Sequence, residues 1–164
     1  MEIEATLAQA KELRQADKLE ESLELLEELL SENPDDPHIL FEVGGAYDVL
    51  GLEGEAIPQY KKAIEEGLED EDLQECLICL GSCHRAIGEF QESVDVLVAF
   101  TEGFPGNAAG LPFLAIAYYG NQQYEEAVSL LLGVLLDTTS DEDILAYADT
   151  LDYYKDNLDE VWDE

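Results

Sequence analysis

Apolar residues recur along the chain at intervals of three and four, the spacing that places them on one face of a helix. Four such runs each follow a small residue: 23–30 after Ser22, 57–64 after Ala56, 94–98 after Ser93 and 128–135 after Ala127. These small residues lie 34, 37 and 34 positions apart. The pattern therefore predicts four amphipathic helices that belong to a repeat of about 34 residues.

A second helix is predicted before each of the last three runs, because a large, large, small, large pattern falls on one face there. The residues are Leu40, Val43, Gly44 and Tyr47; Leu77, Leu80, Gly81 and His84; and Leu111, Leu114, Ala115 and Tyr118. The small residue lets two antiparallel helices approach closely. Turn glycines (Gly51, Gly88 and Gly120) separate the two predicted helices of each pair.

This arrangement resembles the tetratricopeptide repeat, a helix pair of 34 residues whose pattern is W-x2-L-G-x2-Y, then Ala-x3-Phe, then Pro. The best match is formed by Leu40, Val43, Gly44, Tyr47, Ala56 and Tyr60. The stretch 34–136 is also similar to a bacterial tetratricopeptide family of unassigned function, which implies no activity.

The resemblance implies an all-α fold, a right-handed α-solenoid of about four helical hairpins plus a C-terminal capping helix. We expect a single domain over 1–164, with repeats at about 3–36, 37–70, 74–107 and 108–141 and the capping helix at about 142–162. The one spacing of 37 implies three extra residues, which we place in a loop over 67–72, where Leu68 replaces the usual proline.

In this family the first helix of each pair lines a concave groove. The resemblance places the partner-binding residues at Arg14, His38, Phe41, Asp48, Ile78, Arg85, Ile116 and Tyr119. The apolar and aromatic members would anchor a peptide or helix, and Arg14 and Arg85 would orient it. The alternative is that the groove cations only neutralise neighbouring acids. The family's carboxylate clamp needs Lys and Asn at matching positions, and only Lys11 is cationic there, so a co-chaperone of that type is not expected.

The charge excludes two classes of partner. The chain has 40 acidic residues against 7 Lys and Arg, a formal net charge of -33, so nucleic acid and anionic membrane surfaces are repelled. It has no stretch of 18 apolar residues, and its acidic N-terminus does not look like a secretory signal. Three clustered cysteines are not a disulfide framework, so a reducing cytoplasm is the expected location.

The cysteines form the one motif that could indicate a metal or redox site. Cys76, Cys79 and Cys83, followed by His84, fall near one face of a helix and in principle could hold a metal. No second Cys/His pair accompanies them, so packing is the better interpretation. With no phosphate loop, calcium loop or nucleophile elbow, we expect no enzyme, no cofactor and no metal.

These observations favour a non-catalytic protein–protein interaction module or scaffold that binds a peptide or partner helix in the groove. Three alternatives stay open. The first is a dedicated chaperone whose acidic surface holds a basic client. The second is a homodimer that fills its own groove. The third is a metal or redox protein centred on the cysteines.

Overall fold

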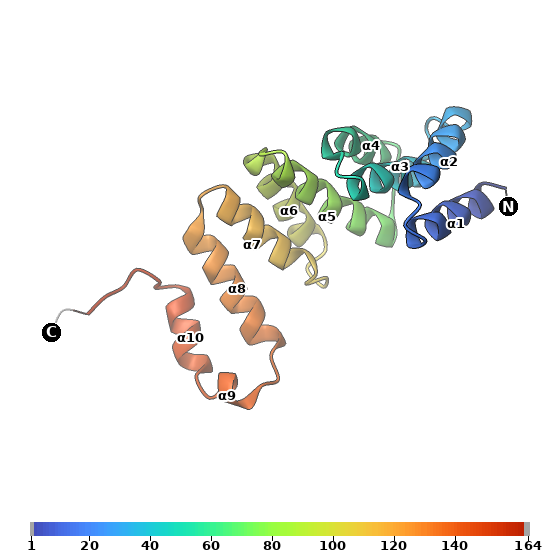
Figure 1. Cartoon of the computed structure of the whole chain (residues 1–164). Helices are drawn as coiled ribbons and strands as arrows, with labels where there is room; N and C mark the ends of the chain where they lie inside the picture. Colours follow the sequence, from blue (N-terminus) through green and yellow to red (C-terminus); the bar gives the residue numbers. More distant parts are fainter. Residues whose placement is uncertain (1, 163–164) are drawn as a thin grey trace.

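The computed structural model describes residues 2–162, and every regular element in that range is an α-helix (Figure 1). The helices are α1 (Glu2–Gln15), α2 (Leu19–Glu32), α3 (Pro37–Val49), α4 (Glu53–Glu65), α5 (Asp70–Ala86), α6 (Phe90–Gly103), α7 (Gly110–Gly120), α8 (Tyr124–Thr138), α9 (Glu142–Leu145) and α10 (Ala148–Lys155). The predicted all-α solenoid is confirmed.

Successive helices pair as antiparallel hairpins, α1 with α2, α3 with α4, α5 with α6 and α7 with α8 (Figure 1). The small residue that opens each repeated run is buried where the two helices cross. Where it is serine, its hydroxyl has a partner: Ser22 Oγ donates to the Ala10 carbonyl at 2.8 Å, and Ser93 Oγ donates to the Gly81 carbonyl at 2.6 Å. Serine can therefore replace alanine at this position without leaving a buried hydroxyl unpaired.

On the first helix of a hairpin, a glycine allows the second helix to approach equally closely. A Cβ on Gly81 would lie 2.5 Å from Leu97 Cγ, and one on Gly44 would lie 2.7 Å from the Tyr60 ring. Both distances are too short for a real side chain, so the second helix packs directly on the backbone of the first.

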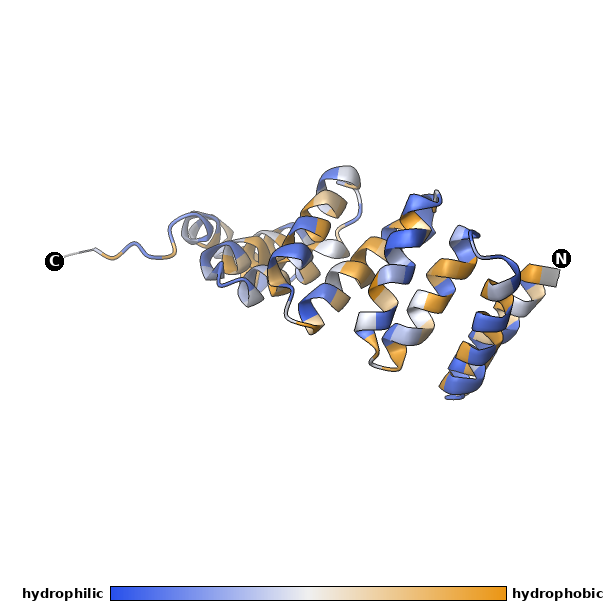
Figure 2. Cartoon of the chain, turned by 90° about the horizontal axis from the view of Figure 1, so that it is seen from above, coloured by the Kyte–Doolittle hydropathy of each residue, from blue (hydrophilic) through white to orange (hydrophobic). Residues whose placement is uncertain are grey.

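The hairpins stack side by side, and each helix carries both apolar and polar positions (Figure 2). The first helix of each later hairpin covers an apolar stripe on the second helix before it. Ile57 and Tyr60 of α4 share a core with Cys76 and Leu80 of α5. The next junction repeats this contact, with residues of α6 and α7 (Val94, Leu97, Leu114 and Ala117) in one cluster. The stability of such an array is approximately the sum of the contributions of its hairpins and of these neighbour contacts.

The three extra residues do not form the longer loop predicted over 67–72. Helix α5 begins at Asp70 and has 17 residues, against 13 in α3 and 11 in α7, so the extra length is absorbed by the helix. Leu68, which stands where the repeat usually has proline, is buried in the core between the second and third hairpins.

The single helix predicted over about 142–162 is wrong in its extent. Asp141 caps α9 by accepting hydrogen bonds from Asp143 N at 3.0 Å and Ile144 N at 3.2 Å, but α9 is short and a turn separates it from α10. Helix α10 stops at Lys155, and Asn157 Nδ2 then donates to the Tyr153 carbonyl at 2.8 Å. Acidic residues follow, and negative charge at a helix C-terminus opposes the helix dipole.

The helices in the described part of the chain are too short or too polar to cross a bilayer.

Candidate protein-binding surface

The first helices of three successive hairpins, α1, α3 and α5, line a hollow of about 440 Å³ together with Tyr60 of α4. We call it the N-terminal hollow, and its lining residues are Lys11, Arg14, Gln15, Phe41, Glu42, Gly45, Asp48, Val49, Tyr60, Asp72, Glu75 and Cys79. It contains three of the predicted groove residues, Arg14, Phe41 and Asp48. Gly45 helps to keep it open, because a Cβ at that position would lie 3.1 Å from Arg14 Nη1.

A buried carboxylate holds the cations of this hollow in place. Glu42 on α3 is buried, and its Oε1 lies 2.7 Å from Lys11 Nζ. Its other oxygen pairs with Arg14, whose guanidinium also donates to the Glu42 carbonyl at 3.5 Å. A buried charge is costly unless it is paired in this way. Arg14 is thus engaged within the protein, as the alternative interpretation of the groove cations anticipated, although its partner is a residue that the sequence analysis did not single out.

The floor of the N-terminal hollow is aromatic and bears one half-buried acid. Phe41 is buried and packs against Tyr60, with ring centroids 6.1 Å apart. Tyr60 donates its hydroxyl to Asp48 Oδ2 at 3.3 Å. Burial raises the pKa of Asp48 above its ordinary value, while hydrogen bonds from Cys83 and Tyr60 act in the opposite direction. An apolar floor beside a partly desolvated carboxylate suits a cation on an apolar stem.

The other predicted groove residues lie outside the N-terminal hollow. Ile78 is half-buried and lines an adjoining hollow with Glu75 and Asn107. His38 is exposed at the start of α3, and its Nδ1 lies 2.9 Å from Asp72 Oδ2. Arg85 is exposed near the end of α5, and the last two residues, Ile116 and Tyr119, are exposed on α7. The structure therefore brings three of the eight together and spreads the rest along the array.

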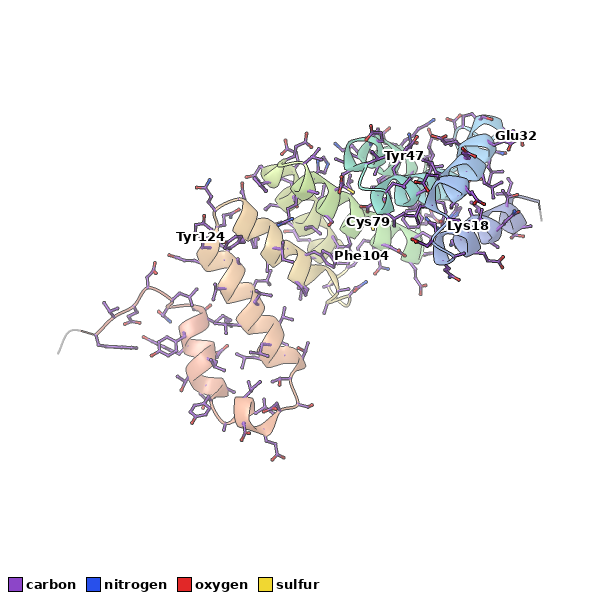
Figure 3. All side chains as sticks on the ribbon, viewed as in Figure 1. Lys18, Glu32, Tyr47, Cys79, Phe104 and Tyr124 are labelled. Carbon is purple, nitrogen blue, oxygen red and sulfur yellow. The ribbon has the colours of Figure 1, made fainter. Side chains whose placement is uncertain are left out.

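The three cysteines are free thiols on α5, with Cys76 and Cys83 buried and Cys79 half-buried. Figure 3 labels Cys79 on this helix. Burial raises the pKa of Cys76 to about 12 and that of Cys79 to about 11, and it also raises the pKa of Cys83. Among the described residues, no group of three His, Cys, Asp or Glu side chains is arranged to hold a metal ion. Burial and the raised pKa values favour packing as the role of these thiols.

The raised pKa values predict that the three cysteine thiols are alkylated slowly. A thiol reacts as its thiolate, so a rise of two pKa units should lower the alkylation rate near pH 8 by roughly 100-fold. We expect Cys76, Cys79 and Cys83 to react with iodoacetamide at least that much more slowly in the native protein than in urea. Mass spectrometry of timed aliquots measures this, and one thiol that reacts equally fast in both states would contradict it.

Stacked antiparallel hairpins, with small residues at fixed positions and a hollow along their first helices, define the class of helical-repeat solenoids. The family model described as Tetratrico peptide repeat matches residues 37–156, and the chain belongs to this family. Proteins of the family are in general non-catalytic protein-interaction modules. A search of curated proteins finds no match.

Solved structures support the same fold. MamA 41-end from Desulfovibrio magneticus RS-1 is 19% identical, with 94% of this chain and 85% of that chain covered and a TM-score of 0.73. The kinesin light chain TPR-like repeats of Podospora anserina are 22% identical, with 96% of this chain and 88% of that chain covered and a TM-score of 0.72. At these identities the likeness is one of fold alone.

Proposed function

We propose that the protein is an interaction module whose concave surface binds a peptide or helix of a partner protein. The observation that supports this is the N-terminal hollow, in which an aromatic floor and several carboxylates converge from three different helices. Repeat arrays generally use the surface formed by corresponding positions of successive repeats for binding.

The charges of the hollow define the ligand. Glu42 pairs with both Lys11 and Arg14. The lining carboxylates of Glu42, Asp48, Asp72 and Glu75 outnumber these two cations, so the hollow stays negative. We therefore propose a ligand segment with a Lys or Arg between apolar residues. Its side-chain stem lies over Phe41 and Val49, and its charged head reaches Asp48.

Replacing Asp48 by asparagine tests this assignment. We expect the affinity for a partner captured from native lysate to fall about tenfold or more, because a charged hydrogen bond contributes roughly 1.5–3 kcal/mol. Stability should not fall. A raised folded-state pKa means that the folded protein favours the neutral acid, so charging Asp48 at pH 7 costs stability, and asparagine avoids that cost. Calorimetric titration and urea unfolding measure the two effects.

Glu92→Gln on α6 is the matched control, because it also removes one negative charge but lies on an exposed position of a second helix. Equal loss of affinity in the two variants would overturn the assignment. It would then favour the acidic-chaperone alternative, in which a basic client is held by overall charge and released by modest salt. A concentration-dependent mass in sedimentation that Asp48→Asn abolishes would favour the homodimer.

A further inference from the structure

At the first inner junction Leu26 is buried and Leu23 is half-buried, and the next two junctions bury both of these positions of a second helix. On α4 these are Ile57 and Tyr60, which are 8% and 1% exposed, and on α6 they are Val94 and Leu97, which are 5% and 1% exposed. The first helix of the next hairpin covers them, together with the first helix of their own hairpin, on which Tyr60 and Leu97 also pack. This stripe is therefore the surface on which a neighbouring helix stacks.

The last hairpin carries the same stripe without a cover. The corresponding residues of α8 are Val128 and Leu131, which are 45% and 46% exposed. Tyr124 and Leu135 are also exposed. Spacings of four, three and four place all of these residues on one face of α8. Two of these four side chains, Val128 and Leu131, thus stand where the second and third hairpins have a buried contact.

The C-terminal helix lies on another side of α8. Helices α3, α5 and α7 each contact both helices of the hairpin before them, whereas α10 contacts α8 and makes no comparable contact with α7 in the described part of the chain. Its end lies near Gly133, where a built Cβ would be 3.7 Å from Lys155 Cδ. Beyond α10, Asp159 shares a hydrogen bond with Glu125, and this contact raises the pKa of Glu125. Gly133 and Glu125 both lie away from the exposed stripe.

The uncovered surface continues onto α7. The rings of Tyr119 and Tyr124 meet edge to face, with centroids 5.2 Å apart. Figure 3 labels Tyr124 at the start of α8. Ile116 is exposed one helical turn before Tyr119. We define the C-terminal stacking face by its six residues, Ile116, Tyr119, Tyr124, Val128, Leu131 and Leu135.

The surrounding charge identifies what fits this face. Residues 124–162 contain eleven acids and one lysine, and that lysine, Lys155, already pairs with Asp152 at 2.9 Å. A second copy of the chain would bring a further formal charge of -33 to the same place. Like charges brought together oppose association, whereas a cationic partner is attracted.

We propose that the C-terminal stacking face binds an amphipathic helix of a partner protein. The apolar stripe of that helix takes the position that the first helix of a fifth hairpin would take, and Lys or Arg residues flank the stripe to meet the acidic rim. This mode is helix-in-groove recognition, with anchors at helical spacing. It uses a different surface from the N-terminal hollow and does not depend on it.

The test uses three synthetic peptides of equal length and the full chain. The first is a helix with Leu at positions i, i+3, i+4 and i+7 and Lys on its flanks. The second has the same composition in scrambled order, and the third has Glu in place of Lys. We expect the first to bind at least tenfold more tightly than either of the others. Leu131→Gln should weaken its binding at least tenfold, while the matched change at another exposed leucine, Leu52→Gln, should not.

Three outcomes would overturn the proposal. Equal binding of the ordered and scrambled lysine peptides would show charge attraction alone. Unchanged binding to Leu131→Gln, with helicity preserved in circular dichroism, would remove the stacking face as the site. A dimer in sedimentation that Leu131→Gln dissociates would make a second copy the occupant. Asp48→Asn should leave the lysine helix bound, so failure here is distinguishable from failure at the N-terminal hollow.

Discussion

Replacing Tyr60 by alanine is expected to lower the free energy of unfolding by about 3–5 kcal/mol, the range for removing a large buried aromatic side chain. Tyr60 is 1% exposed and lies at the centre of the junction between the second and third hairpins. Its ring fills the space beside Gly44 and packs on Phe41, so alanine would leave a cavity that rigid neighbours cannot close. Urea unfolding followed by circular dichroism measures the loss.

Tyr60→Phe is the control, because it keeps the ring and removes only the hydroxyl that donates to Asp48. We expect it to cost about 0.5–1.5 kcal/mol, the net contribution of one hydrogen bond. A loss as large as that of the alanine variant would mean that the hydroxyl, and not the packing of the ring, holds this junction together.

Gly81→Ala should lower the free energy of unfolding by about 1–3 kcal/mol through overpacking. The added Cβ would sit 2.5 Å from Cγ of Leu97, and Leu97 is buried and has no room to withdraw. The two helices of the third hairpin must then separate, which also weakens the bond from Ser93 to the Gly81 carbonyl.

The opposite sign is expected for Gly54→Ala. Gly54 lies in the first turn of α4, and a Cβ there meets nothing within 4 Å. Alanine favours the helix over glycine by up to about 1 kcal/mol, so this variant should be as stable as the wild type or more so. Thermal unfolding of Gly81→Ala and Gly54→Ala, measured side by side, checks the two expected changes in stability. If Gly54→Ala were also destabilised, overpacking at the helix crossing would not explain the loss of stability in Gly81→Ala.

Sequence pattern predicts the hairpins well, because the helix-crossing positions have strict chemical requirements. A buried crossing accepts only small residues, so Ser22, Ala56, Ser93 and Ala127 mark the register of each hairpin. Helix ends are harder to predict. The three extra residues extend α5 because acidic residues at Asp70, Glu71 and Asp72 favour a helix N-terminus. From the repeat spacing alone, the same residues are predicted to form a loop.

The candidate site was predicted only in part. The sequence indicates which residues lie on the groove-facing side of a helix, but it does not reveal which side chains bind one another. Phe41 lies in the predicted helix but is buried against Tyr60. Glu42 was missed, although a signal for it exists. It is the single acid in the apolar run 39–43, and a carboxylate in such a run needs cations from a neighbouring helix. The roles proposed for Arg85, Ile116 and Tyr119 remain predictions.

The first hairpin determines how copies of this chain can meet. The positions of α1 that correspond by the 34-residue repeat to the buried Ile39, Val43 and Ala46 of α3 are Ala5, Gln9 and Glu12, all exposed. An array with an apolar stripe at one end and a matching stripe at the other could add copies head to tail without limit, because such heterologous contacts do not close. In this chain the corresponding face of α1 carries Gln9 and Glu12 in place of an apolar stripe. Head-to-tail growth of copies through the C-terminal stacking face is therefore disfavoured.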